Sequence, residues 1–194
     1  MANPFEQLSA KAGTTDRSMQ WYQANIRKLA SGLNTPQEVM SSDLGKLKSS
    51  LDIGGMYMFV YEPKTKDRLP YWDTFPLCVP FDDAPGGFYG LNLHYLPPLL
   101  RAQLLDRLEK TQDKIPDKDG YSKMQVSWNL LKKVSRFPEV RPCVKRYITK
   151  NIRSRFLQVK TEHWRASIFM PTQNFVGAGQ QKIYRDSREI INGR

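Results

Sequence analysis

The residues of this sequence best suited to chemistry are the basic side chains of its last third. Residues 1–131 hold 15 basic and 15 acidic residues, whereas residues 132–194 hold 15 basic and only 4 acidic residues. The whole net charge of +11 therefore belongs to the last third of the chain. Such a local excess attracts a polyanion, either a nucleic acid, an anionic membrane surface or an acidic protein partner.

Phosphate binding is the chemistry that these cations favour. If residues 144–155 form a helix, Arg146, Lys150 and Arg153 recur at spacings of four and three and share one helical face. A stripe of this kind is suited to following a DNA backbone. The predicted DNA-binding residues are Lys132, Lys133, Arg136, Lys145, Arg146, Lys150, Arg153, Arg155 and Arg165.

Aromatic residues alternate with these cations, as in Arg146-Tyr147, Arg155-Phe156 and Trp164-Arg165. In proteins that bind single strands, aromatic rings stack on bases beside cations that hold phosphates. The sequence carries no helix-turn-helix, zinc-finger or ribonucleoprotein signature. We therefore expect contact with the phosphate backbone that does not depend on base sequence.

Two other uses of the same charge remain open. Basic residues also dock on acidic faces of neighbouring subunits, and surface tryptophans such as Trp72 and Trp164 favour interfaces. This alternative describes a structural subunit that uses its basic face for assembly with other proteins. The remaining alternative is a basic surface with no special role.

Candidates for catalysis or metal binding are sparse. The two histidines, His94 and His163, stand in aromatic surroundings that favour a structural role. Asp82-Asp83 precedes Pro-Gly-Gly, where adjacent acids are typical of a turn, and a hard cation needs several converging oxygen ligands. Neither a GxxxxGKS/T loop nor a GxGxxG motif occurs. We therefore predict a non-enzymatic protein without cofactor, metal or small-molecule substrate.

The composition, with 40% hydrophobic residues, predicts a folded protein of 194 residues. No apolar run is long enough to cross a bilayer, and the first residues lack the pattern of a secretory signal. We therefore expect a soluble protein from a reducing compartment that has no membrane partner. Cys78 is expected to be buried and inert, whereas basic neighbours of Cys143 would lower the pKa of its thiol.

The chain divides into a helical N-terminal segment, 1–50, and a single α+β domain, 51–194. The spacing of apolar residues predicts a helix over 16–29, and Thr35-Pro36-Gln37-Glu38 has the form of a capping box that begins a second helix.

In the second part, a small antiparallel sheet is predicted at about 55–96. Its strands lie near 56–61, 69–81 and 88–96, and turn residues at 82–87 join the last two. Helices flank the sheet, and the C-terminal third is predicted to be basic and helical. The expected helices cover residues 99–110, 122–136 and 144–155, with a strand before 159 and a helix at 181–191.

Five segments carry a resemblance to a known family. They are 56–63 (MYMFVYEP), 69–77 (LPYWDTFPL), 87–97 (GFYGLNLHYLP), 164–171 (WRASIFMP) and 184–188 (YRDSR). Together they resemble the DNA end protector family, minor virion proteins of T-even-type contractile-tailed phages. The resemblance covers about 56–108 and 163–190.

The resemblance implies a non-enzymatic virion protein that shields genome ends from host exonuclease or completes the head and neck. It also implies other phage virion proteins as partners, and a location in the virion and in the host cytoplasm during assembly. Proteins of similar pattern can instead be structural subunits of the neck, tail or baseplate. No catalytic residues accompany the resemblance.

Overall fold

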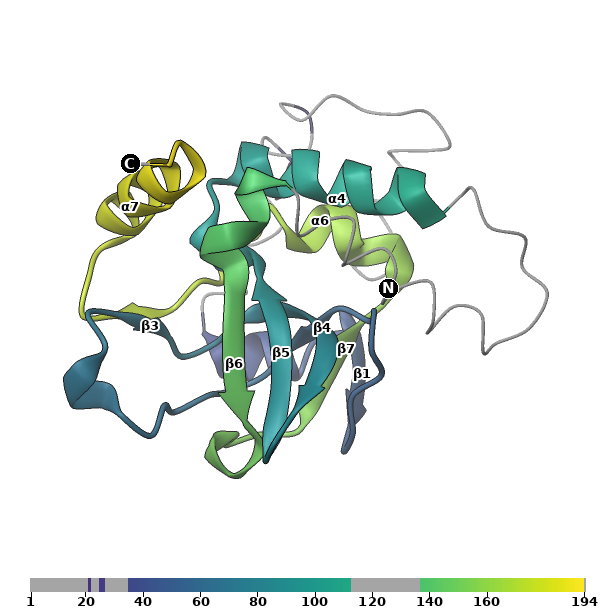
Figure 1. Cartoon of the computed structure of the whole chain (residues 1–194). Helices are drawn as coiled ribbons and strands as arrows, with labels where there is room; N and C mark the ends of the chain where they lie inside the picture. Colours follow the sequence, from purple (N-terminus) through teal and green to yellow (C-terminus); the bar gives the residue numbers. More distant parts are fainter. Residues whose placement is uncertain (1–20, 22–24, 27–34, 113–136, 194) are drawn as a thin grey trace.

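Short runs of aromatic and aliphatic residues build an antiparallel sheet of six strands (Figure 1). The computed structural model describes residues 21, 25–26, 35–112 and 137–193. Across the sheet the order is β1 (Gly45–Lys48), β7 (Phe156–Val159), β2 (Tyr57–Met58), β4 (Leu77–Ala84), β5 (Gly87–Asn92) and β6 (Val144–Ile148). A separate pair of strands consists of β3 (Trp72–Asp73) and β8 (Phe175–Val176).

Glycine makes the β4–β5 hairpin and its pairing with β6 possible. Gly86 lies at the turn with φ of +71°, a conformation that side chains other than glycine rarely adopt. At Gly87 a Cβ atom would lie 1.8 Å from the backbone oxygen of Tyr147 on β6. The missing side chain therefore lets β6 approach β5 closely enough to pair along its length.

The two faces of the sheet bury different cores. One face packs aliphatic residues such as Leu77 and Leu91 against helical residues that include Leu104 and Ala166. The other face buries an aromatic cluster around Phe59, whose ring lies edge-on to four neighbours. These neighbours are Tyr61, Phe88, Tyr147 and Phe156. Long-range packing on both faces thus holds β2 and β6 in the fold.

Helices surround one end of the sheet. In Figure 1, α4 (Pro98–Gln112) and α6 (Trp164–Ser167) lie together above the strands, and α7 (Gln180–Ile191) lies at the upper left, above β3. A short helix, α3 (Pro36–Met40), precedes β1. The 3₁₀ segments are η2 (Lys66–Arg68), η3 (Leu93–Tyr95), η4 (Pro138–Cys143), η5 (Thr149–Asn151) and η6 (Thr161–His163).

A buried arginine joins the helices to the end of β5. The guanidinium of Arg101 is completely buried and donates hydrogen bonds to the backbone oxygens of Leu96, Ile168 and His94 and to the hydroxyl of Tyr184. Burial lowers the pKa of Arg101, although the nearby ionisable groups of Tyr184, Asp73 and Cys143 oppose this effect. Arg101 therefore holds α4, α6 and α7 in a fixed relation to η3.

The α+β fold class is confirmed, with antiparallel strands between 55 and 96 and helices beside them. The capping box is present, since Thr35 Oγ1 accepts from Glu38 N at 3.2 Å and Thr35 N donates to Glu38 Oε2 at 2.8 Å. The helices expected at 99–110 and 181–191 are α4 and α7. The extended segment after β4 is shorter than expected, because the chain turns into η3 after Asn92.

The helix predicted over 144–155 is wrong. Residues 144–148 form β6, and residues 149–151 form the 3₁₀ turn η5. β6 pairs with β5 and buries Tyr147 in the aromatic cluster, so a tertiary contact decides the conformation of this segment. The strand expected before residue 159 is β7. The helices predicted over 16–29 and 122–136 lie outside the described residues, and a domain boundary at residue 50 stays a prediction.

Candidate nucleic-acid interface

The predicted DNA-binding residues do not share one helical face. Lys132, Lys133 and Arg136 lie outside the described residues. The other six occupy three places: Lys145 faces a cavity beside β6, Arg165 lies on α6, and the rest run from Arg146 within β6 along the connection to β7. This last group, called here the basic connection, consists of Arg146, Lys150, Arg153 and Arg155.

Three cations of the basic connection form no ion pair with an acid in the part of the chain that the structure describes. Arg146 Nη2 donates to the backbone oxygen of Pro85 at 2.8 Å, and Arg155 Nη2 donates to that of Leu47 at 3.2 Å. Lys150 is exposed on η5. Within the described residues none of these three forms an ion pair with a carboxylate. Their positive charge is therefore available to an external anion.

Two other predicted residues are held in ion pairs. Arg153 Nε lies 3.0 Å from Glu62 Oε2, and the same carboxylate also pairs with Lys66. Hydrogen bonds from Lys66 and then Arg153 lower the pKa of Glu62. On α6, Arg165 Nη2 lies 3.2 Å from Asp106 Oδ1 of α4. These arginines contribute less net positive field than the unpaired members of the set.

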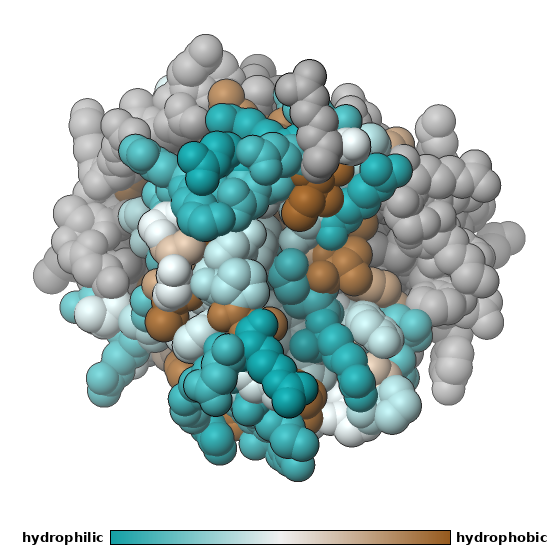
Figure 2. Space-filling model, turned by 60° about the vertical axis from the view of Figure 1, so that its left-hand side comes forward, coloured by the Kyte–Doolittle hydropathy of each residue, from teal (hydrophilic) through white to brown (hydrophobic). Residues whose placement is uncertain are grey.

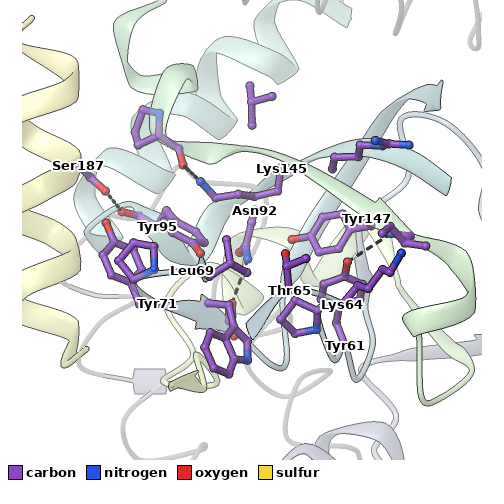
Figure 3. A pocket seen from close by; sticks show the side chains of 18 of the residues that line it. Tyr61, Lys64, Thr65, Leu69, Tyr71, Asn92, Tyr95, Lys145, Tyr147 and Ser187 are labelled. Atoms are coloured by element: carbon purple, nitrogen blue, oxygen red, sulfur yellow. Dashed lines mark hydrogen bonds between the residues drawn. The ribbon is translucent and has the colours of Figure 1, made fainter. Parts of the chain in front are cut away.

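A cavity of about 460 Å³ lies between β6, α7 and the segment that leads to β3. Figure 3 shows Lys145 and Tyr147 of β6 on the same side of their strand, as expected for residues two positions apart. Further aromatic side chains that line the cavity are Tyr61, Tyr71, Trp72 and Tyr95. The cavity thus combines a cation with several flat aromatic surfaces.

Lys145 is the cation that lies deepest in this cavity wall. Its Nζ donates to the backbone oxygen of Pro142 at 2.8 Å and lies 3.9 Å from the centre of the Tyr95 ring. Burial lowers the pKa of Lys145, because removal from water disfavours the charged form. No carboxylate of the described chain pairs with it. The Pro142 carbonyl and the Tyr95 ring therefore face its charge directly.

The floor of the cavity is polar but fully hydrogen-bonded. Asp73 Oδ2 accepts from Asn92 Nδ2 at 3.1 Å and from His94 Nδ1 at 2.7 Å, and Asp73 Oδ1 accepts from the backbone nitrogens of Phe75 and Asn174. Burial acts to raise the pKa of Asp73, but His94 and these hydrogen bonds outweigh it, so the pKa is lowered. The carboxylate of Asp73 thus accepts four hydrogen bonds from the protein itself.

Asp73, His94 and Thr172 form a chain of hydrogen bonds with the order seen in hydrolases. His94 Nε2 lies 3.2 Å from Thr172 Oγ1, while its Nδ1 faces Asp73. Burial lowers the pKa of His94, which keeps the ring neutral, with Nδ1 donating to the carboxylate and Nε2 accepting from the hydroxyl. His94 is completely buried and Thr172 is 8% exposed, so a substrate has no access to this pair. The chain ties β3 and η3 to the segment before β8.

Both cysteines are buried and carry no exposed thiol. The expectation that basic neighbours lower the pKa of Cys143 is wrong, because burial raises this pKa to about 12 and outweighs the effect of Lys145. Among the described residues no group of three or more acidic, histidine or cysteine side chains converges as metal ligands. Within the same residues no helix has the length and apolar character needed to cross a membrane.

Sequence reasoning missed the cavity and most of the residues that line it. Its walls come from the segments 61–73, 92–95, 142–148 and 187–190, which no local pattern connects. One signal was present, since Lys145 and Tyr147 have the spacing of side chains on one face of a strand. The prediction of a helix at 144–155 excluded a strand in which these two side chains share one face.

The geometry provides exposed cations for an anionic backbone and a cavity with a lysine and aromatic walls. No curated protein and no solved structure matches the chain. A family model described as the phage T4 terminal DNA protecting protein matches residues 6–190. This match confirms the resemblance to phage DNA end protectors and supports a role in the protection of phage DNA ends. Since it extends over nearly the whole sequence, the chain belongs to the phage T4 terminal DNA protecting protein family.

Proposed function

We propose that the protein protects the ends of phage DNA by binding the phosphate backbone next to each terminus, without catalysing a reaction. The family membership supports protection of DNA ends as the role. Bound protein would exclude an exonuclease by covering the end from which the enzyme starts. In this proposal the protein acts in the virion and in the host cytoplasm during assembly, beside other virion proteins.

The observation that carries the proposal is the unpaired charge of Arg146, Lys150 and Arg155. Ion pairing would weaken their attraction for phosphate, but no acid of the described chain pairs with them. Within the described residues, Arg146 and Arg155 each donate one hydrogen bond to a backbone oxygen, so other guanidinium N–H groups remain for a phosphate. Phosphate contacts of this kind position a protein on DNA and carry no base-sequence information.

The proposal is tested by DNA binding at increasing salt and by protection of linear DNA against an exonuclease. Removal of three phosphate contacts should reduce the slope of log affinity against log salt by about 2.7, since each contact contributes about 0.9. The test variant is R146Q/K150Q/R155Q. The matched control, R141Q/R185Q/R188Q, removes three exposed arginines from η4 and α7.

The test variant should lose most of its exonuclease protection, whereas the control should retain most of it. Equal losses in the two variants would place the phosphate contacts elsewhere and contradict this assignment. A wild-type protein that ignores DNA but captures another virion protein would favour the alternative, a structural neck, tail or baseplate subunit. Cleavage of the DNA in the presence of magnesium would contradict the non-enzymatic role.

A further inference from the structure

Exposed apolar side chains gather around the cavity beside β6. Six large hydrophobic residues are notably exposed among the described residues, and three of them, Leu69, Val144 and Ile190, line this cavity. Figure 2 brings the α7 side forward and shows hydrophobic patches between larger hydrophilic areas. An apolar rim costs free energy in water unless a ligand covers it, so the rim points to a ligand with an apolar surface.

The cavity wall also carries a cation, Lys145, that pairs with no acid among the residues that the structure describes. Lys145 lies beside Tyr95 and Tyr147, and Lys64 and Arg146 contribute further positive charge to the lining (Figure 3). The acid on the floor, Asp73, is already bound by four donors and cannot pair with Lys145 without losing them. A ligand that fits has an anionic group for Lys145 and a flat apolar part for the aromatic walls and the rim.

We propose that this cavity binds the 5′-phosphorylated terminal nucleotide of a DNA strand. Lys145 holds the terminal phosphate, with Lys64 and Arg146 adding to the positive field. The base lies against aromatic side chains such as Tyr71 and Trp72 and against the apolar rim. This inference rests on the proposed function and adds to it the group by which an end is recognised.

The size and the chemistry of the cavity agree with this ligand. Cavities that bury small organic ligands commonly have volumes of about 300–1,000 Å³, and this one measures about 460 Å³. A terminal phosphate monoester carries a charge of about −1.5 to −2 at pH 7, whereas an internal phosphodiester carries a single charge. A half-buried lysine such as Lys145 therefore discriminates in favour of the terminus.

A cavity also distinguishes an end from the middle of a duplex by geometry. Inside a duplex, a base enters a cavity only after it leaves the stack, which costs a few kcal/mol. At an end, one face of the last base pair is already exposed and only one stacking contact is lost. The cations of the basic connection attract either kind of site, so the cavity supplies the preference for ends.

The test compares three unlabelled competitors of one base sequence against a fluorescent, 5′-phosphorylated linear duplex. The competitors are the same linear duplex, a linear duplex with 5′-hydroxyl ends, and a closed circle without ends. Wild-type protein should prefer the phosphorylated ends over both other competitors. K145M keeps an apolar stem but removes the charge. Its preference for phosphorylated ends should be about tenfold smaller than that of the wild type, as expected when a charge-assisted hydrogen bond is lost.

The matched control is K46M, which removes one exposed cation from β1 at the opposite edge of the sheet. It should retain the preference for phosphorylated ends. A second variant, V144E, places a negative charge on the exposed rim and should reduce the preference even if K145M does not fold.

The outcomes separate this inference from the proposed function. If the wild type binds the circle as tightly as phosphorylated ends, the terminal-nucleotide site is wrong while binding to the backbone stands. If the wild type binds none of the DNAs, the proposed function itself is wrong. A preference for ends that both K145M and V144E retain would place the recognition of ends outside this cavity.

Discussion

The basic connection and the cavity beside β6 differ in how the fold holds their charges. Along the basic connection, Lys150 and Arg155 are exposed, and Arg155 donates to a backbone oxygen. Arg146 is also exposed and donates to a backbone oxygen, and it borders the cavity as well. In the cavity, Lys145 is held between a carbonyl and an aromatic ring. Exposed charges attract any polyanion over a distance, whereas a buried charge discriminates between ligands at contact.

Because of this difference, we propose that the two regions contribute differently to DNA binding. The basic connection supplies affinity that falls with salt and does not distinguish an end from the interior of DNA. The cavity has a fixed shape and a single deep cation, so it supplies selection of ends. β6 joins the two regions, since successive residues of this one strand, Lys145 and Arg146, contribute to them.

The largest effect is expected from D73A. Asp73 is completely buried and accepts four hydrogen bonds, so its removal leaves donors of Asn92 and His94 unpaired in the protein interior. Because each unpaired buried donor costs about 1–3 kcal/mol, the free energy of unfolding should fall by about 3–5 kcal/mol. Urea denaturation followed by circular dichroism measures this loss.

D73N is the matched comparison, because the amide keeps the shape but accepts fewer hydrogen bonds. Its loss of stability should lie between the wild type and D73A. Stability unchanged in both variants would mean that the floor of the cavity does not depend on this network. The cavity would then be less rigid than its proposed selectivity requires.

The second-largest expected effect is a change of DNA binding with pH, which should differ between the cavity and the basic connection. Burial lowers the pKa of Lys145, so this side chain loses its proton at a lower pH than an ordinary lysine, whose pKa is about 10.4. Lys145 is charged below its pKa and neutral above it. As the pH rises toward about 10, the preference for 5′-phosphorylated ends should therefore decline. Arginine keeps its charge throughout this range, since its pKa exceeds about 12.

Competition binding across this pH range measures the two contributions separately. The affinity for the closed circle should change less, because three of the four cations of the basic connection are arginines. A parallel decline of both affinities would indicate that one set of groups governs both regions. In K145M, the preference for ends should be low at every pH and should show no further decline.

The sequence predicts the parts of this fold that local chemistry decides. The capping box of Thr35 and Glu38 begins α3, and Pro85-Gly86 turns β4 into β5. The apolar spacing of residues 99–110 likewise predicts the helix that the structure shows as α4. In each case, the residues that determine the structure lie within a few positions of one another.

The sequence could not predict the parts that distant contacts decide. Residues 144–148 are compatible with a helix or a strand, and the free edge of β5 makes them a strand. The cavity depends on that strand and on α7, which lies about forty residues further along the chain. The charge asymmetry indicated an anionic partner, but it could not show that the six described members of the predicted DNA-binding set divide among three places.

The smallest expected effect is a difference in the salt dependence of DNA binding between two single variants, one of an ion-paired surface arginine and one of an arginine without an acidic partner among the described residues. Arg165 was predicted to bind DNA, but its guanidinium lies 3.2 Å from Asp106. R165Q should therefore leave the slope of log affinity against log salt nearly unchanged. R155Q, which removes an arginine without an acidic partner among the described residues, should reduce the slope by about 0.9. An equal change in both variants would show that DNA displaces Asp106, so ion pairing would no longer distinguish the arginines that bind DNA from those that do not.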